Sequence, residues 1–151
     1  DVVDVESAGE MTEAALAACG IADALISAAA ISDYTVARHD GKIRSGASSL
    51  TLELSSTPKL LDTVREEYPG LPLVGFKAEP GSDDETLAGK ARETLDRVDL
   101  AFVVANDAAV MGAADTRALV VRADGFEAYR GPKLGLGLRV ADELATVLAE
   151  G

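Results

Sequence analysis

Residues 26–34 bring together side chains that could bind a ligand, in the order Ile-Ser-Ala-Ala-Ala-Ile-Ser-Asp-Tyr. The apolar run ends in Ser32, Asp33 and Tyr34, a pattern that predicts a central buried strand with its polar end at the carboxyl edge of a sheet. Open α/β sheets bind their ligands at that edge. The alanines leave room for a ligand, and the Asp33 carboxylate accepts hydrogen bonds from a sugar hydroxyl or an amine. A packed strand followed by a polar turn would produce the same pattern.

Two further apolar runs also end in polar side chains. Residues 71–76 run into Lys77-Ala78-Glu79, and residues 100–105 run into Asn106-Asp107. Parallel strands joined by helices place such ends at one edge of a sheet, so we expect the three polar ends to lie together. Asn106 is compatible with two roles, binding a substrate or capping the turn that follows.

The elements that must position these side chains are predicted from periodicity and from cap and turn residues. Ser7 and Glu10 form the S-x-x-E pattern of a capping box, and Thr57-Pro58 is typical of a helix start with Thr as the cap. Asp124-Gly125 indicates a β-hairpin. The expected strands are 1–5, 24–31, 50–54, 71–76, 100–105, 117–122 and 126–129, and the expected helices are 7–20, 57–69, 83–97 and 134–148.

This order of elements predicts a single α/β domain over residues 1–151. Strands alternate with helices up to residue 105, which favours a Rossmann-like three-layer α/β/α fold with a mostly parallel central sheet. The C-terminal β-hairpin and closing helix complete the expected architecture. The chain begins with Asp1 and its first residues already have the pattern of a strand. We therefore expect the chain to be a fragment that lacks its N-terminal part.

A long polar segment, residues 35–49, separates two expected strands. It contains Gly41-Lys42-Ile43-Arg44, two positive charges beside a glycine. Polar connections of this length are often binding loops or lids, and some are only disordered. A mobile flap closing over phosphates fits the two charges.

The chain is strongly acidic, with a net charge of −12 and only five lysines among its 151 residues. This balance argues against nonspecific binding to nucleic acid or to anionic membranes, because both require a surplus of Lys and Arg. It also suggests a halophilic protein, since an acidic surface keeps proteins soluble at high salt. No apolar run is long enough to span a membrane and no signal region is present, so we expect a cytoplasmic protein.

Several familiar sites are disfavoured by the residues present. Cys19 and His39 are the only cysteine and histidine, which argues against catalytic triads and against histidine-rich or multi-cysteine metal sites. Gly135-Leu136-Gly137 lacks the third glycine of a dinucleotide fingerprint, and Gly89-Lys90 lacks the rest of a P-loop. The acidic residues 83–85 suit a helix start better than a cation site.

Taken in order, these segments resemble the phosphopantothenoylcysteine synthetase domain of coenzyme A biosynthesis. The resemblance covers nearly the whole chain and is carried by motifs that each lie at a predicted strand end or loop. They are Ala29-Ala30-Ile31-Ser32-Asp33-Tyr34, Gly41-Lys42-Ile43-Arg44, Thr57-Pro58-Lys59-Leu60-Leu61, Gly75-Phe76-Lys77-Ala78-Glu79, Asp99 through Ala105-Asn106-Asp107, and Gly131-Pro132-Lys133.

The resemblance implies a two-step ligation. A nucleoside triphosphate, CTP in the bacterial and archaeal type, activates the carboxylate of 4′-phosphopantothenate, and the amine of cysteine then displaces the nucleotide. Mg²⁺ is expected from the triphosphate chemistry. By resemblance Lys42 is the catalytic flap lysine that stabilises charge at the α-phosphate. The nucleotide and substrate site implied in the same way comprises Ala29, Asp33, Lys42, Thr57, Pro58, Lys59, Leu60, Phe76, Lys90 and Asn106.

The chain departs from the family pattern at several places. The glycine- and serine-rich segment that precedes this region in the family is missing, so the fragment by itself is expected to bind nucleotide and to lack turnover. Ser45 and Thr94 stand where the family has basic residues, and Arg92 or Arg97 could compensate. The family also implies a homodimer, for which the hairpin at Asp124-Gly125 offers a contact.

Alternatives in other classes remain open at this point. In this family a flavin-dependent decarboxylase domain is a common upstream fusion partner, and FMN would be required only if that domain is present. The main alternative function is a noncatalytic nucleotide-binding α/β module. A Rossmann-type dehydrogenase fragment is disfavoured because the glycine fingerprint is absent. Phe76 could equally be a core residue, and Lys90 an ordinary helix lysine.

Overall fold

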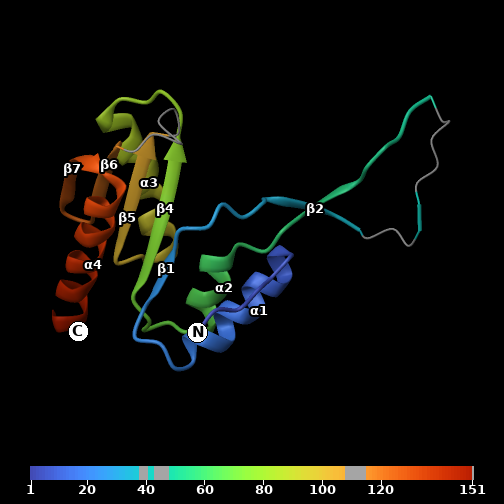
Figure 1. The fold of residues 1–151 in the computed structure, drawn as a ribbon, viewed down its shortest axis with the longest axis horizontal. Coiled ribbons are helices and arrows are strands. Elements are labelled where there is room, and N and C mark those ends of the chain that lie inside the picture. The colour runs from blue at the N-terminus through green and yellow to red at the C-terminus, as the bar shows by residue number, and fades with distance from the viewer. Residues whose placement is uncertain (38–40, 43–47, 108–114, 151) are drawn as a thin grey trace.

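The computed structural model describes residues 1–37, 41–42, 48–107 and 115–150. Its centre is a five-stranded sheet in the spatial order β1-β4-β5-β6-β7, which Figure 1 shows between two layers of helices. The first three of these strands are parallel and the last two are antiparallel additions. The strands are β1 (Leu25–Ser27), β4 (Leu73–Glu79), β5 (Phe102–Asp107), β6 (Asp115–Arg122) and β7 (Gly125–Pro132).

Helices cover both faces of the sheet, so the predicted three-layer α/β/α fold with a hairpin and closing helix is confirmed. On one face lie α1 (Ala8–Cys19), α2 (Leu60–Glu67) and α3 (Asp84–Val98). On the other face α4 (Lys133–Glu150) packs over β6 and β7, as Figure 1 shows. A hydrophobic core lies on each face of the sheet, and side chains of β5 alternate between the two. Phe102 and Val104 point to the α4 side, and Val103 and Ala105 point to the opposite side.

Local sequence explains the ends of several helices. The Ser7 hydroxyl accepts a hydrogen bond from the Glu10 amide at 3.2 Å, and the Glu10 carboxylate accepts one from the Ser7 amide, so the predicted capping box forms. Asp83 caps α3 by accepting from the Thr86 amide at 2.8 Å. Burial of Cys19 at the end of α1 raises the pKa of its thiol, as expected for a small buried apolar residue.

Three predicted strands differ from those observed. Residues 1–5 form no strand within the described chain, and Val2 and Val3 are exposed. The strand expected over 24–31 is only β1, a short edge strand paired with β4 alone; it is not a buried central strand, because the chain leaves the sheet at Ala28. The strand expected over 50–54 lies at Leu54–Ser56 instead, since its partner fixes the register.

Strands β2 (Tyr34–Val36) and β3 (Leu54–Ser56) form a separate antiparallel ribbon. Figure 1 shows that this ribbon, here called the arm, projects from the body of the domain between β1 and α2. Its apolar side chains are largely solvent-exposed: Tyr34, Val36, Leu50, Leu52 and Leu54. Two strands without a covering layer are only marginally stable in water, so the arm depends on its surroundings for stability.

Two predicted boundaries shift by a few residues. Helix α2 begins at Leu60, with Lys59 as its N-cap and no side-chain cap, so the prediction that Thr57 caps the helix is wrong. The reason is the backbone conformation of Lys59, which is extended with φ −79° and ψ 119°, so that helical geometry begins only at Leu60. The predicted hairpin is confirmed, but its two-residue turn is Ala123-Asp124, because Arg122 pairs with Gly125. Among the described residues, none of the helices combines the length and apolar character needed to cross a lipid bilayer.

Candidate functional site

The carboxyl ends of β4 and β5 lie side by side, as the sequence predicts. The parallel register pairs Ala78 with Asn106 and Glu79 with Asp107. These polar residues are the last residues of their strands, whereas the sequence places them after the strands. The difference arises because both strands extend further toward the C-terminus than expected. The two polar ends therefore meet at one edge of the sheet, the edge at which open α/β sheets bind ligands.

A polar cavity of about 240 Å³ opens on the α2 side of this edge. It gathers most of the residues that the resemblance assigns to the nucleotide, from the segment after β1, the loop before α2, and β4. The predicted members that line it are Ala29, Asp33, Thr57, Pro58, Lys59, Leu60 and Phe76. Side chains far apart in the sequence are thus brought to one place by the parallel βαβ arrangement.

The two loops of this cavity are tied together by the backbone. The Thr57 amide donates to the carbonyl oxygen of Asp33 at 2.9 Å, and the Ser32 hydroxyl donates to the carbonyl oxygen of Tyr34 at 2.7 Å. The Thr57 hydroxyl is buried and has no hydrogen-bond partner among the described residues. A buried hydroxyl without a partner is costly, which points to a ligand group that completes its hydrogen bonding.

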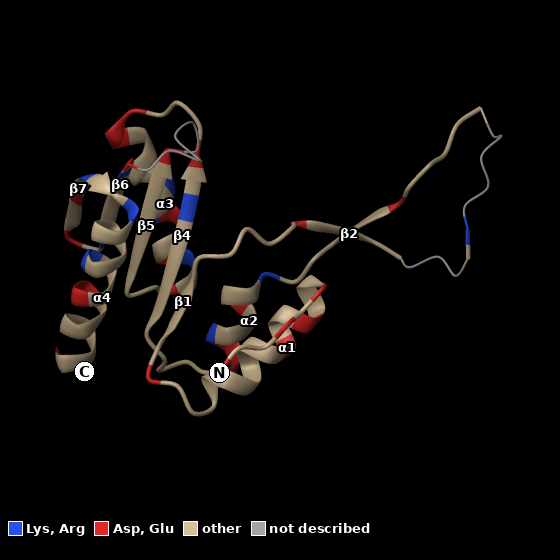
Figure 2. Cartoon of the chain, viewed as in Figure 1, with Lys and Arg blue, Asp and Glu red and all other residues tan. Residues whose placement is uncertain are grey.

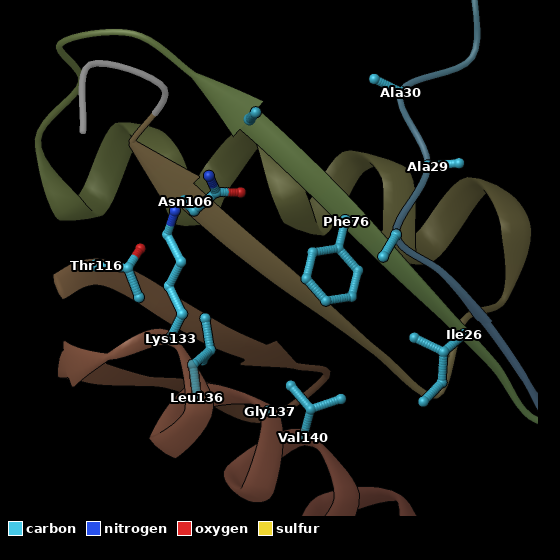
Figure 3. Close-up of a pocket in the computed structure, with 12 residues that line it drawn as sticks. Ile26, Ala29, Ala30, Phe76, Asn106, Thr116, Lys133, Leu136, Gly137 and Val140 are labelled. Carbon is cyan, nitrogen blue, oxygen red and sulfur yellow. The ribbon is translucent and has the colours of Figure 1, made fainter. Parts of the chain in front are cut away.

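A larger, mainly apolar cavity of about 610 Å³ lies on the α4 side of the same strands (Figure 3). Phe76 from β4 faces Leu136 and Val140 from α4, and the polar members are Asn106, Thr116 and Lys133. The predicted residue Asn106 therefore lies in this second cavity and not in the polar one. Ala29 and Phe76 line both cavities, so the two spaces adjoin there.

Lys90 does not line either cavity; it pairs with a carboxylate at the edge. Its ammonium lies 2.7 Å from Oε2 of Glu79, and the Lys77 ammonium lies 2.9 Å from Oε1. Hydrogen bonds from Lys90 and then from Lys77 lower the pKa of Glu79 to about 2, so the carboxylate is ionised at neutral pH. Figure 2 shows the basic segment of β4 close to its acidic carboxyl end.

The two arginines proposed to compensate for Thr94 have different surroundings. Thr94 and Arg97 both line the polar cavity, and Arg97 is paired with Asp62 on α2. Arg92 donates to the carbonyl oxygens of Arg122 and Ala123, both at 3.0 Å, and so fastens α3 to the hairpin. Arg92 therefore cannot fill the cavity, and only Arg97 is placed to compensate.

Lys42 is exposed and lines neither cavity. It lies in the sequence between β2 and β3, the two strands of the arm, which lead away from the sheet in Figure 1. The polar cavity therefore brings together the predicted residues of the two loops, of β4 and of the start of α2, and it includes neither Lys42, Lys90 nor Asn106. The neighbouring motif residues Ile43 and Arg44 lie outside the described residues.

Sequence reasoning did not include Lys77 and Lys133 among the site residues. Lys77 lines the polar cavity and Lys133 the apolar one. The sequence held a weak signal, because each of only five lysines in a chain of net charge −12 is informative and Lys77 directly follows the apolar run 71–76. Only the structure shows that Lys59, Lys77, Lys90 and Lys133 lie at or beside one edge of the sheet.

The described residues contain no group of three His, Cys, Asp or Glu side chains that could hold a metal ion. Mg²⁺ needs no such cage when it is bound mainly through the phosphates of a nucleotide and one or two carboxylates. The exposed carboxylate of Asp33, which lines the polar cavity, fits this second mode.

Comparison with known proteins identifies the family of this chain. The profile of the family described as DNA/pantothenate metabolism flavoprotein C-terminal domain matches residues 1–148. The chain belongs to this family.

Among the curated relatives is the coenzyme A biosynthesis bifunctional protein CoaBC of Thermococcus kodakarensis, 40% identical over 128 residues, covering 83% of this chain and 32% of that protein. Phosphopantothenate–cysteine ligase 1 of Oryza sativa is 38% identical over 85 residues, covering 52% of this chain and 25% of that protein. The chain thus spans only a quarter to a third of these relatives. The crystal structure of the DNA/pantothenate metabolism flavoprotein from Streptococcus pneumoniae has the same fold, with a TM-score of 0.83 and 22% identity over 97% of this chain and 73% of that one.

Proposed function

We propose that this chain is the ligase part of a phosphopantothenate–cysteine ligase of coenzyme A biosynthesis. The observation that carries the proposal is the pair of adjoining cavities at the carboxyl edge, one polar and one apolar, which share Ala29 and Phe76. A nucleotide suits the polar cavity, and a flexible acyl chain suits the apolar cavity. The reacting groups would meet where the cavities join.

The proposed nucleotide is CTP. In the first step an oxygen of the 4′-phosphopantothenate carboxylate attacks the α-phosphorus, an acyl-cytidylate forms and pyrophosphate leaves. In the second step the cysteine amine attacks the acyl carbon, CMP leaves and the amine gives up a proton. Asp33, Thr57 and the residues up to Leu60 would hold the ribose and base. They offer a carboxylate, backbone groups and a hydroxyl that has no partner in the described part of the chain, all in one cavity.

Negative charge gathers at the α-phosphate during the first step, so the reaction needs cations that reach it. We assign this role to Lys42, carried by the arm, with Lys90 at the sheet edge as a further cation. Because Lys42 lies away from the cavities, the arm would have to close to bring it in, which would also exclude water. Mg²⁺ would supply charge neutralisation on the triphosphate when bound, beside Asp33.

The acyl substrate would occupy the apolar cavity. Its lining of alanines, Phe76, Leu136 and Val140 matches the methyl and methylene groups of a pantothenoyl chain. The Asn106 side chain, one of the few polar groups there, can donate to or accept from the amide of that chain.

Further properties complete the proposal. We infer a homodimeric, cytoplasmic protein with a single synthetase domain in this region, and a fused flavoprotein decarboxylase domain with FMN where the full protein has one. The exposed apolar side chains of the arm support association with a second copy of the chain. Burial of these side chains against another surface would remove them from water and stabilise the ribbon. The net charge of −12 supports adaptation to high salt.

The proposed function is tested by assaying the full-length protein for pyrophosphate release and for the cysteine adduct. Release should require 4′-phosphopantothenate, and the adduct should require cysteine as well. Lys42→Gln should abolish most turnover and leave CTP binding largely intact. The control, Arg130→Gln, makes the same charge change at an exposed position on β7 that lines neither cavity. A wild-type protein that binds nucleotide and makes no product would instead be a noncatalytic nucleotide-binding module.

A further inference from the structure

Lys77 and Lys90 share one carboxylate, that of Glu79, at the carboxyl edge of the sheet, and Lys77 also lines the polar cavity. Each uses a different oxygen of Glu79, at 2.9 Å for Lys77 and 2.7 Å for Lys90, so both pairs form at the same time. Lys77 and Glu79 are two residues apart on β4 and therefore point to the same face of the sheet. Lys90 reaches the same carboxylate from α3. The three side chains form a cluster, here called the lysine pair and its anchor.

This cluster has charge and donors to spare. Two ammonium groups facing one carboxylate leave a net charge of +1. An ammonium has three N–H donors, and among the described residues each lysine uses one of them, on Glu79, so two donors on each are left for a ligand. The Lys77 and Lys90 side chains are 37% and 43% exposed, whereas the Glu79 side chain is 21% exposed. The two ammonium groups are therefore more accessible to a ligand than the carboxylate.

The other two cations among the described residues that line the cavity, Arg97 and Lys59, are differently placed. Arg97 is neutralised by Asp62, one positive charge against one negative charge. Lys59 is an exposed loop residue at the start of α2. Among the described residues that line the cavity, Lys77 is thus the cation that is both held in position and left with surplus charge, and Thr94 lines the same cavity.

From this geometry we infer that Lys77 binds the phosphate chain of the nucleotide from the strand side of the polar cavity, and that Glu79 is a positioning residue that keeps Lys77 and Lys90 directed to it. The inference rests on the proposed function, because it requires a nucleoside triphosphate as the ligand. It assigns a further cation of the phosphate site, besides Lys42 and Lys90, to a residue of strand β4. Lys77 should therefore contribute to the higher affinity of the site for a nucleoside triphosphate than for a nucleoside monophosphate.

Calorimetric titration of the full-length protein with CTP and with CMP tests this assignment. A hydrogen bond to a charged group changes affinity by roughly tenfold or more. Lys77→Gln should therefore weaken CTP binding about tenfold or more and change CMP binding little. Lys77→Arg should restore much of the loss, and Arg130→Gln should change neither ligand. Equal CTP affinity in wild type and Lys77→Gln, or an equal loss for CTP and CMP, would overturn the assignment.

The role of Glu79 is tested by a double-mutant cycle with Glu79→Gln. If Glu79 acts by holding the lysines, the loss caused by Lys77→Gln should be smaller in the Glu79→Gln background than in wild type. Additive effects would show that Glu79 does not position Lys77. If the wild-type protein binds no nucleotide, the proposed function itself fails, whereas normal CTP binding by Lys77→Gln overturns this inference alone.

Discussion

The backbone amide of Thr57 donates a hydrogen bond to the carbonyl oxygen of Asp33 at 2.9 Å, and this bond joins the two loops that form the wall of the polar cavity. Thr57 lines the cavity, and its hydroxyl has no partner among the described residues. Helix α2 begins at Leu60, two residues after the Pro58 start that the Thr-Pro pattern predicts. The local helix signal at Thr57-Pro58 therefore does not set the start of α2.

The unpaired hydroxyl gives a prediction with opposite signs for stability and binding. Thr57→Val removes a buried hydroxyl without a partner, so the free energy of unfolding should rise slightly, by about 1 kcal/mol or less. Nucleotide affinity should fall by roughly five- to tenfold because a hydrogen bond to the ligand is lost. Thermal unfolding and calorimetric titration measure the two effects.

The matched control is Thr146→Val, which removes a hydroxyl bonded to Asp142 within α4 and away from both cavities. It should leave nucleotide affinity unchanged. Unchanged affinity in Thr57→Val would contradict a role for that hydroxyl in binding.

The pH dependence of stability should report on Glu79. Its pKa falls from 4.5 to about 2 on folding, because Lys90 and Lys77 donate to the ionised form. A lowered pKa stabilises the folded state above pH 4.5, and this contribution is lost as the pH falls from 4.5 toward 2. Glu79→Gln should therefore flatten the fall in Tm across that window. Asp83, whose pKa is lowered by hydrogen bonds from Thr86, should keep part of the slope.

Melting curves of wild type and Glu79→Gln at pH 7, 4.5 and 2.5 measure this difference. Parallel Tm profiles for the two proteins would show that the carboxylate is not held by the lysines in solution.

Gly75 in the middle of β4 is required by close packing. A Cβ atom at this position would lie 2.8 Å from Cδ1 of Leu100, which is buried. Gly75→Ala should lower the free energy of unfolding by about 1–3 kcal/mol, because the core would have to shift. Gly89→Ala is the control, since nothing lies within 4 Å of its added Cβ in helix α3. It should raise stability by about 0.5–1 kcal/mol. Urea unfolding measures the free energy of unfolding of both variants. An unchanged free energy of unfolding in Gly75→Ala would contradict the close packing of Gly75 against Leu100.

The charge of −12 predicts stability that depends on salt. Repulsion among exposed carboxylates destabilises the folded chain at low ionic strength and is screened at high ionic strength. The Tm should therefore rise between 0.1 M and about 2 M KCl. Indifference of the Tm to KCl would count against the halophilic interpretation.

The general architecture was predictable because local signals and tertiary structure agree. The capping box at Ser7, the hydrophobic face of 83–97 and the apolar runs at 71–76 and 100–105 each specify an element by their own periodicity, and the structure confirms each. The meeting of polar groups at the carboxyl edge also follows from sequence, since parallel strands leave little choice.

The predicted strands were wrong where strand pairing, and not the intrinsic β-propensity of the residues, determines whether a strand forms and where it ends. Apolar residues at 1–5 and 50–54 read as strands, but neither stretch forms the strand expected over it in the described chain. The extent of β1 was overestimated for the same reason, because Ala28 leaves the ladder while the sequence remains apolar. Lys77 was missed because only the fold shows that a strand lysine and a helix lysine share Glu79.

The central claim is that this sheet edge binds a pyrimidine nucleoside triphosphate, and calorimetric titration tests it most directly. Full-length protein in low and in molar KCl would be titrated with CTP and Mg²⁺, and separately with ATP and with NAD. We predict saturable binding of CTP in preference to ATP and NAD, lost on substitution of Asp33 by Ala. Binding of none of these nucleotides under either salt condition, or preference for NAD, would contradict the account.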